Sequence, residues 1–447
     1  MSGKLKGSQK PEFYLGILVL FLVVGLLNIC FAVLYQKIVL INEGTISVSK
    51  ITAKSGSPAD IQAAVNTISA VGGGTVYIPE GDWRCDQTPG GAVNIDLSSL
   101  ADGAWLNIIG STNTTVAATN SGQFRQMPAV ILRSSVGNSA SPIVATFRIY
   151  GAPNKHIRIS GLAVLGKVIS ESCENTDIYL KSVDGFRIDH CFIDSSTEAD
   201  ILAHMSKGLI DHCNIDQTYS LNYIPPGRTT PIEASWGYGI FVAGDQNTGF
   251  GGYATWVPSL DTILGKYDWT GIPYTAGPVY IEDNVFNHCR HAITSSQYGY
   301  YVTRHNLFQT ARSDGTPYID VHGSGFAAGR GLEAYDNEIT GGCPGFNIRG
   351  GGGVIFNNNI HDINLFSFLW NEGPGPVQEY VHDLWIWNNT LTNVGTIFNL
   401  ENPSPVAGVD YFNDNFQGRI TPTNPAPPRP GYIPYQYPHP LTLQQTP

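Results

Sequence analysis

A short phrase that recurs at nearly regular intervals is the strongest constraint on the fold of this chain. In each copy, a strand-like apolar stretch is followed by a polar residue, then by asparagine, and two positions later by an apolar residue. The asparagines stand at positions 284, 306, 337, 358 and 389, in steps of 22, 31, 21 and 31 residues. The same slot holds Cys191 and Cys213 further upstream. A repeat of this length with one or two short strands predicts a solenoid.

Asparagine needs a structural reason at this position, because it is a poor strand former. If successive coils stack, the side-chain amide of each asparagine can bond the one above and the one below. Asparagine also tolerates the left-handed backbone conformation of a tight corner. We therefore predict that Asn306, Asn337 and Asn358 are buried in a ladder along one corner of a β-helix. The alternative, separate β-hairpins with asparagine in their turns, does not explain the aligned second strand that follows each corner.

An uncharged apolar run occupies residues 13–35. As a helix this run is about 35 Å long, enough to cross the roughly 30 Å hydrocarbon core of a bilayer. Three lysines lie in the preceding residues 1–12 and only Lys37 follows closely, which predicts a cytoplasmic N-terminus. A signal peptide is the alternative, but no small-x-small cleavage site follows the run. We expect an uncleaved single-pass anchor at the cell membrane, with the rest of the chain outside the cytoplasm.

A helix is predicted at the start of the solenoid, after a linker at residues 36–56. Ser57 is a suitable N-cap, Pro58 suits the first helical position, and Asp60 complements the positive end of the helix dipole. One apolar face follows, made by Ile61, Ala64, Val65 and Ile68. Such a helix would cover the open end of the first coil, which otherwise exposes core and strand edges.

The segment PADIQAAVNTISAVGGGTVYIPEGDW, residues 58–83, resembles the opening of right-handed parallel β-helix proteins of the pectate-lyase-like (pectin lyase fold) superfamily. Those proteins begin with a capping helix, a glycine run and a strand that ends in Ile-Pro-x-Gly, and the repeated asparagine corners are similar to theirs too. The resemblance covers about residues 57–418. It implies an all-β fold, a single-stranded right-handed parallel β-helix. It leaves activity open, because this fold hosts lyases, hydrolases, epimerases, phage tailspikes and surface proteins.

Two segments depart from the repeat. The period breaks in an insert at about residues 219–276 that is rich in Tyr, Trp, Gly and Pro, and Gly239–Ala243 within it is the predicted strand of that coil. The rest would form two long loops, whose aromatic rings either stack on sugar rings or bury themselves against the solenoid. Residues 419–447 form a proline- and tyrosine-rich tail that is predicted to be extended, either packed along the solenoid or acting as a spacer.

Composition narrows the possible partners. The formal net charge is −11, which argues against a nucleic-acid partner. The seven cysteines include no CxxC pair, so a zinc or redox site has little support. No cofactor can be assigned and no metal site is predicted. The sequence does not define an oligomeric state.

Candidate catalytic residues lie on and beside the second strands of neighbouring repeats. Asp320 and His322 alternate along one strand and therefore share its outer face, and Arg349 falls beside His322 on the next coil. Arg330 and Glu333 enter from the loop and the strand between these two coils. Neighbouring parallel strands lie about 4.8 Å apart, so these side chains are predicted to form one outward cluster.

Such a cluster suits acid–base chemistry on a sugar chain. In β-elimination of a uronate polymer, an arginine would neutralise the sugar carboxylate while a base removes the adjacent proton. In glycoside hydrolysis, Asp320 and Glu333 would be the paired carboxylates. The alternative is an ion ladder that only stabilises a parallel sheet.

The catalytic motifs of the superfamily's polygalacturonases do not transfer residue by residue. Val321-His322-Gly323 supplies only His-Gly, and neither an Asp-Asp pair nor Arg-x-Lys occurs. We therefore predict a membrane-anchored extracytoplasmic β-helix protein that binds or cleaves a polysaccharide or cell-envelope glycan, as a lyase or a glycoside hydrolase. The alternative is a non-catalytic structural or adhesion protein of the cell surface.

Overall fold

The computed structural model describes residues 49–86, 91–119, 122–134, 144–166, 175–194, 196–217, 237–244, 278–310, 315–323, 328–373, 379–413 and 428–443. The predicted anchor at residues 13–35 and the N-terminal segment 1–12 lie outside this part, as does most of the aromatic insert. Among the described residues, no helix is both long enough and apolar enough to cross a membrane.

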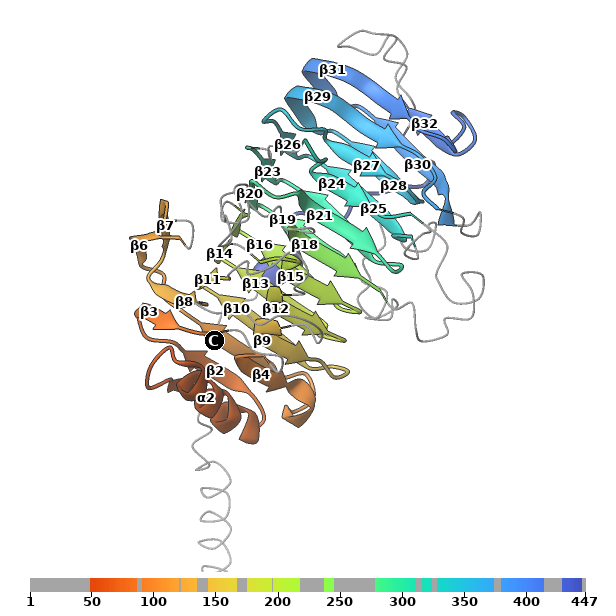
Figure 1. The fold of residues 1–447 in the computed structure, drawn as a ribbon. Helices are drawn as coiled ribbons and strands as arrows, with labels where there is room; N and C mark the ends of the chain where they lie inside the picture. Colours follow the sequence, from red (N-terminus) through yellow and green to blue (C-terminus); the bar gives the residue numbers. More distant parts are fainter. Residues whose placement is uncertain are drawn as a thin grey trace, which may run out of the picture. The chain divides into compact units, whose positions relative to one another are not determined.

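Parallel strands stack into three long faces around one apolar core (Figure 1). The first, which we name face A, consists in the described chain of β1 (Lys50–Thr52), β2 (Gly74–Tyr77), β5 (Trp105–Ile109), β10 (His156–Ser160), β13 (Asp184–Asp189), β16 (Lys207–Asp211), β19 (Val279–Glu282), β22 (Tyr300–Arg304), β25 (Gly331–Tyr335), β28 (Gly351–Phe356), β30 (Val381–Trp387) and β32 (Tyr411–Asn413).

From β2 to β30, the chain passes from each strand of face A to face B1 and then to face B2. Face B1 consists of β3 (Gly81–Arg84), β8 (Val130–Arg133), β11 (Ala163–Leu165), β14 (Phe192–Asp194), β17 (Asn214–Asp216), β20 (Val285–Asn287), β23 (Leu307–Phe308) and β26 (Glu338–Ile339). Face B2 consists of β4 (Val93–Asp96), β9 (Val144–Tyr150), β12 (Asn175–Lys181), β15 (Ala199–His204), β18 (Tyr238–Ala243), β21 (His291–Ser296), β24 (Ile319–Val321) and β27 (Phe346–Ile348). Two longer strands, β29 (Asn359–Leu369) and β31 (Thr390–Leu400), run through both.

The predicted parallel β-helix is therefore confirmed, although a coil has three strands where the sequence pattern indicated one or two. Residues of like character stack in register, as in the inward column Ile108, Ile159, Ile188, Ile210 and Ile281 of face A. A slip of one residue would turn each such column outward, so burial of the apolar positions fixes the register. The predicted strand at Gly239–Ala243 is present as β18.

The asparagine ladder is present at the corner between faces A and B1. Asn306, Asn337 and Asn358 are buried, as predicted. The Oδ1 of Asn337 accepts hydrogen bonds from both the backbone N and the Nδ2 of Asn306, each at 3.1 Å. Asn337 in turn donates its backbone N and its Nδ2 to Oδ1 of Asn358, at 3.1 and 2.9 Å. Cys191 and Cys213 are buried free thiols in the same slot.

The left-handed residue at each corner is the one before the ladder position, which corrects the sequence argument. His190, His212, Asp283, His305 and Asp336 all have φ between 54° and 56°. Asn357 and Asn388 take the same conformation at 55° and 53°. The ladder asparagine supplies hydrogen bonds, and its polar predecessor supplies the turn, since short polar side chains tolerate this region better than most.

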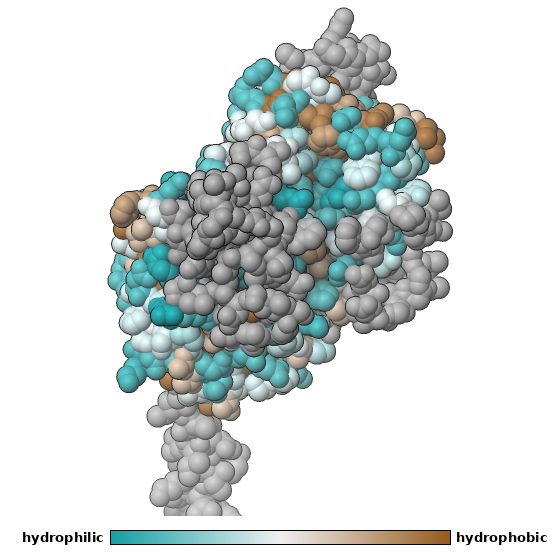
Figure 2. All heavy atoms as spheres, in the orientation of Figure 1, coloured by the Kyte–Doolittle hydropathy of each residue, from teal (hydrophilic) through white to brown (hydrophobic). Residues whose placement is uncertain are grey.

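The predicted capping helix is α2 (Pro58–Ala70), which closes the first coil. Ser57 caps it by accepting a hydrogen bond from the backbone N of Asp60 at 3.3 Å, and the four predicted apolar residues are buried. Past its C-cap Val71, Gly72 has a φ of 93°, a conformation that glycine adopts without a steric penalty. The other end of the described stack ends at β31 and β32, where Leu400, Val406 and Val409 are exposed. Hydrophobic atoms are visible on the surface near this end in Figure 2.

Three short elements complete the described part: the 3₁₀ turn η1 (Leu97–Ser99), the antiparallel hairpin of β6 (Thr114–Ala118) and β7 (Phe124–Pro128), and the short helix α5 (Pro440–Leu443). The C-terminal residues 428–443 pack against the outside of face A. Arg304 of β22 donates to the backbone carbonyls of Tyr435 and Gln436 at 2.8 and 3.0 Å, and Arg187 of β13 donates to that of Leu441 at 3.0 Å. Of the two possibilities for the tail, these residues follow the first, packing along the solenoid.

Replacing Asn337 by leucine should destabilise the β-helix by several kcal/mol. The change removes the acceptor of two buried N–H groups and the donor to Asn358, and each unsatisfied buried group costs about 1–3 kcal/mol. Asn357→Asp is the matched control, because residue 357 is exposed, and aspartate tolerates its left-handed backbone and keeps the oxygen that accepts from Asn388. Urea denaturation of both variants checks this. An unchanged midpoint for Asn337→Leu would contradict the role of the ladder.

Candidate functional site

Asp320, His322 and Arg349 converge on the outer surface of face B2. Asp320 lies on β24, opposite Thr294 of β21 on one side and Asn347 of β27 on the other. His322 follows β24 directly and Arg349 follows β27 directly, so continuing the register places them side by side. Alternation along a strand therefore brings together the three residues that the sequence placed on this surface.

Asp320 is the buried centre of this group. Its carboxylate accepts hydrogen bonds from Thr294 at 2.7 Å and Asn347 at 2.9 Å. Arg349 donates to both of its oxygens, from Nε at 3.1 Å and from Nη2 at 2.8 Å. His322 places its Nε2 3.3 Å from Oδ2 of the same carboxylate. Arginine and carboxylate form two parallel bonds, an arrangement that fixes the geometry of both groups.

Glu372, which follows β29, joins the group from the other side of Arg349. Its Oε1 accepts from Nη1 of Arg349 at 2.7 Å, and its Oε2 accepts from the backbone N of Gly323 at 3.0 Å. Its Oε2 also lies 4.0 Å from Nδ1 of His322. The side chains of His322, Arg349 and Glu372 are 9%, 11% and 17% exposed, so the group is shielded but not closed. We name Asp320, His322, Arg349 and Glu372 the Asp320 cluster.

Opposing effects set the protonation states in the Asp320 cluster. Burial alone would raise the pKa of Asp320, but Arg349 and the nearby His291 and His322 hold it well below its ordinary value, so this carboxylate is ionised. Burial lowers the pKa of His322 to about 4, with Asp320 opposing that shift. At neutral pH the cluster therefore holds a neutral imidazole against an ionised carboxylate. This imidazole can accept a proton, but its low pKa makes it a weak base.

Sequence reasoning missed Tyr238 and Glu372. Tyr238 begins β18, its ring centroid lies 5.6 Å from that of His291 and 6.4 Å from that of His322, and burial raises its pKa. Tyr238 and His291 each stand at the first position of consecutive B2 strands, and this alignment could have identified Tyr238 from the sequence. No sequence pattern could have identified Glu372, because it follows an eleven-residue strand that crosses two faces without a corner.

Arg330 and Glu333 do not join the Asp320 cluster. Glu333 lies on β25 of face A, where the hydroxyl groups of Tyr300 and Tyr432 donate to its carboxylate. Tyr432 belongs to the C-terminal segment, so Glu333 holds that segment to the solenoid. Arg330 is buried at the start of β25, and its backbone N donates to the carbonyl of Gly299. The sequence argument placed both residues between the right coils but did not separate face A from face B2.

Half-buried aromatic rings flank the Asp320 cluster on the same surface. Phe241 of β18 is in register with Thr294, and Phe368 of β29 is in register with Asn347. Trp370 donates from its indole N–H to Oδ1 of Asn347 at 3.2 Å and is also half-buried. The predicted groove walls in the insert 219–276 lie mostly outside the described residues. In the described part, no group of three or more His, Cys, Asp or Glu side chains could hold a metal ion.

No protein-family model matches the chain, and no curated protein matches it. Solved structures do resemble it. An alginate lyase from Paenibacillus sp. is 13% identical, with a TM-score of 0.44, over 78% of this chain and 97% of the lyase. The A-module of mannuronan C-5 epimerase AlgE6 from Azotobacter vinelandii is 14% identical, with a TM-score of 0.43, over 82% of this chain and 96% of the module.

A DFA-IIIase from Arthrobacter chlorophenolicus is 13% identical, with a TM-score of 0.41, over 81% of this chain and 80% of that protein. The resemblance to right-handed parallel β-helix proteins that the sequence indicated is confirmed at the level of fold, and the three parallel faces show the same architecture. At these identities the likeness concerns the fold alone.

Stability should fall as the pH is lowered from about 6.5 toward about 4, because His322 has an ordinary pKa of 6.5 and a folded pKa of about 4. In that window the unfolded chain binds a proton that the folded chain does not, which favours unfolding by at most about 3 kcal/mol for this residue. Urea denaturation at pH 7 and pH 4.5 measures the loss. His322→Gln should reduce it, whereas His361→Gln, at a half-buried imidazole whose pKa is raised by Asp362 and Glu338, should not. An equal loss in the His322→Gln variant would show that His322 is not the group responsible.

Proposed function

We propose that this chain binds a polysaccharide along the outer surface of face B2 and cleaves it with His322 as a general base. The observation that carries the proposal is the Asp320 cluster itself, a neutral imidazole held against an ionised, buried aspartate and flanked in register by half-buried aromatic rings. Aromatic side chains present a broad apolar surface on which a sugar ring can lie, and the polar centre between them supplies directed hydrogen bonds.

Asp320 suits the role of an orienting group. It is ionised and fixed by Thr294, Asn347 and Arg349, so it can hold the imidazole and stabilise the positive charge that develops when His322 accepts a proton. This division of roles between an imidazole and a buried carboxylate recurs among enzymes with a histidine base. A proton taken from a sugar carbon leads to β-elimination, and a proton taken from water leads to hydrolysis.

Arg349 affects which glycan fits. All three of its guanidinium nitrogens already donate to Asp320 or Glu372, so two carboxylates face one guanidinium. An excess of negative charge favours a neutral sugar unit over a uronate next to the cluster. A surface protein that only binds glycan is the second candidate, and the contacts of Arg349 with Asp320 and Glu372 favour it, because they would also tie neighbouring coils together without any chemistry.

Cleavage should depend on His322. The full-length chain is incubated with a panel of neutral and uronate polysaccharides, and products are assayed both for new reducing ends and for the ultraviolet absorbance of an unsaturated sugar. His322→Gln should lower turnover by roughly 10²–10⁴-fold, the usual contribution of a general base, while glycan binding is retained. His361→Gln is the control and should leave turnover unchanged.

The assay also separates the two candidates. Binding without product by the wild-type chain would assign the surface to a glycan-binding protein. The absence of both binding and turnover across the panel would overturn the proposal. A His322→Gln variant that cleaves as fast as the wild-type chain would exclude His322 as the base.

We also propose that residues 13–35 anchor the chain in the cell membrane with the β-helix outside the cytoplasm, on the strength of the uncharged run and the lysines before it. Protease added to intact cells that express the full chain should then digest the β-helix, while a cytoplasmic marker survives. A chain that begins at residue 36 should leave the membrane fraction. Digestion only after lysis, or a mature N-terminus beyond residue 30, would contradict this topology.

A further inference from the structure

An inserted hairpin forms a pocket on a side of the solenoid that the proposed function does not use. Between β5 and β8, where most coils turn a tight corner, the chain makes the hairpin of β6 and β7, which stands off the stack (Figure 1). Its base packs on face B1, because Met127 and Ala117 cluster with Ala163, Leu165 and Phe192. Arg125 lies 3.6 Å from Asp216 of β17, which ties the hairpin to a more distant coil.

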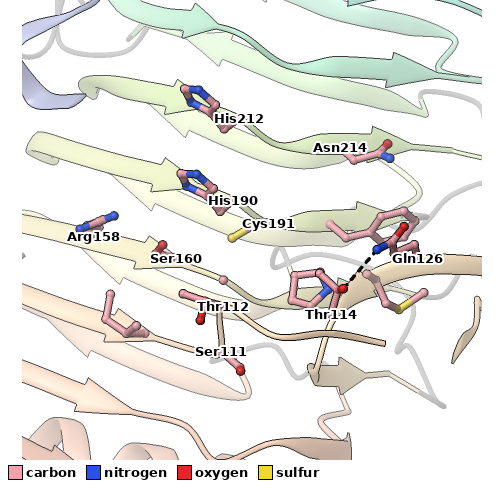
Figure 3. A pocket seen from close by; sticks show the side chains of 16 residues that line it. Ser111, Thr112, Thr114, Gln126, Arg158, Ser160, His190, Cys191, His212 and Asn214 are labelled. Atoms are coloured by element: carbon pink, nitrogen blue, oxygen red, sulfur yellow. Dashed lines mark hydrogen bonds between the residues drawn. The ribbon is translucent and has the colours of Figure 1, made fainter. Parts of the chain in front are cut away.

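The pocket between this hairpin and the corner of the following coils has a volume of about 410 Å³, within the usual range of small-molecule sites (Figure 3). Its apolar side includes Met127, Pro128 and Phe192. Its polar lining includes Thr112, Gln126, Arg158, His190, His212 and Asn214. Three of these are basic and none is acidic, although the whole chain carries a net charge of −11.

Two stacked histidines form the corner side of the pocket. His190 and His212 occupy the left-handed position of consecutive coils, with ring centroids 5.1 Å apart and planes inclined by 4° (Figure 3). Nδ1 of each histidine is hydrogen-bonded to the aspartate that precedes it. The distance is 2.8 Å from His190 to Asp189 and 2.9 Å from His212 to Asp211. A carboxylate only accepts, so Nδ1 carries the proton and Nε2 points to the other side of the ring. The two imidazoles are 59% and 47% exposed.

Charge behind the histidines is balanced. Arg158 donates to both oxygens of Asp189 at 2.6 and 2.7 Å, and Arg187 donates to both oxygens of Asp211 at 2.9 and 2.8 Å. The hydrogen bond to Asp211 raises the pKa of His212, so any charge that the pocket gains on this side is positive. Parallel rings 5.1 Å apart do not suit one shared metal ion, since bonds of about 2.1 Å require nitrogens within about 4.2 Å.

We propose that this pocket is a second ligand site, which binds a small hydroxylated carboxylate through the Nε2–H groups of His190 and His212 when both imidazoles are doubly protonated, because only that form donates from both ring nitrogens. The carboxylate would lie against the two imidazoles, and hydroxyl groups of the ligand would bond Asn214, Gln126 and Thr112. The apolar side at Met127 and Phe192 would cover one face of the ligand. The site lies on the corner between faces A and B1, whereas the Asp320 cluster lies on face B2, so the inference does not rest on the proposed function.

The test uses the full-length chain in a detergent without a sugar head group, and isothermal titration with D-glucuronate and D-glucose at about pH 5.5, below the ordinary imidazole pKa of about 6.5. The two probes differ only in the carboxylate, so glucuronate should bind about tenfold or more tightly than glucose. The double variant His190→Asn, His212→Asn should lose this binding by at least about tenfold. It should still fold, because Asn357 and Asn388 occupy the same corner position in other coils.

His305→Asn is the matched control, since His305 has the same corner conformation but lies outside the pocket. It should bind glucuronate as the wild-type chain does. Thr112→Trp, at an exposed residue of the pocket wall, should block binding without touching the corner. If a galacturonate tetramer binds more tightly than glucuronate, the ligand is the end of a polymer. If the tetramer and glucuronate bind with equal affinity, the ligand is a free sugar acid.

Three results would overturn the inference. They are no binding of glucuronate or the tetramer, equal affinity for glucose and glucuronate, and unchanged binding in the double variant. His322→Gln should leave this binding intact, so the result is read separately from the test of the Asp320 cluster.

Discussion

The amide ladder at the corner between faces A and B1 is the interaction on which the rest of the structure depends. Each ladder asparagine joins two coils through its side chain, as Asn337 does with Asn306 and Asn358. Backbone hydrogen bonds between parallel strands do not by themselves distinguish one register from another. The buried amides do, because a coil shifted by one residue would leave their donors and acceptors without partners. Fixed register at one corner then aligns the outward residues on all three faces of these coils, and the Asp320 cluster is such an alignment.

The three outer surfaces are used differently. The C-terminal segment covers part of face A, where it meets Glu333 through Tyr432 and Arg304 through two carbonyl groups. Face B2 carries the Asp320 cluster, which no described segment covers in the same way. The corner between A and B1 is partly enclosed by the β6–β7 hairpin. Packing that stabilises the solenoid and surfaces open to a ligand are thus separated by face, which allows a surface to change its chemistry without disturbing the core.

Much of the fold followed from the sequence, because its signals are local. The ladder positions, the cap Ser57 and the apolar face of α2 each depend on residues a few positions apart. The grouping of Asp320, His322 and Arg349 also followed, since alternation along a strand and one step between coils suffice. Glu333 and Glu372 needed knowledge that no local pattern holds. Assigning Glu333 requires knowing which face β25 joins, and that Tyr432, about a hundred positions away along the chain, contacts it. Placing Glu372 requires knowing that β29 passes the second corner without a turn.

The corner position before each ladder residue shows how function can arise on such a scaffold. Its backbone must be left-handed, a conformation that favours glycine, asparagine, aspartate and histidine. The described coils use histidine, aspartate and asparagine there, and glycine at position 161. The fold therefore selects side chains that can bond a ligand, while leaving open which of them stands in a given coil. Where two histidines follow one another beside an inserted hairpin, the same constraint yields a pair of oriented imidazoles. Where the corner holds Asn357 and Asn388, it yields an exposed amide contact between coils. The backbone requirement is the same in both places, so the chemistry depends on the local choice of residue and on what the neighbouring loops enclose.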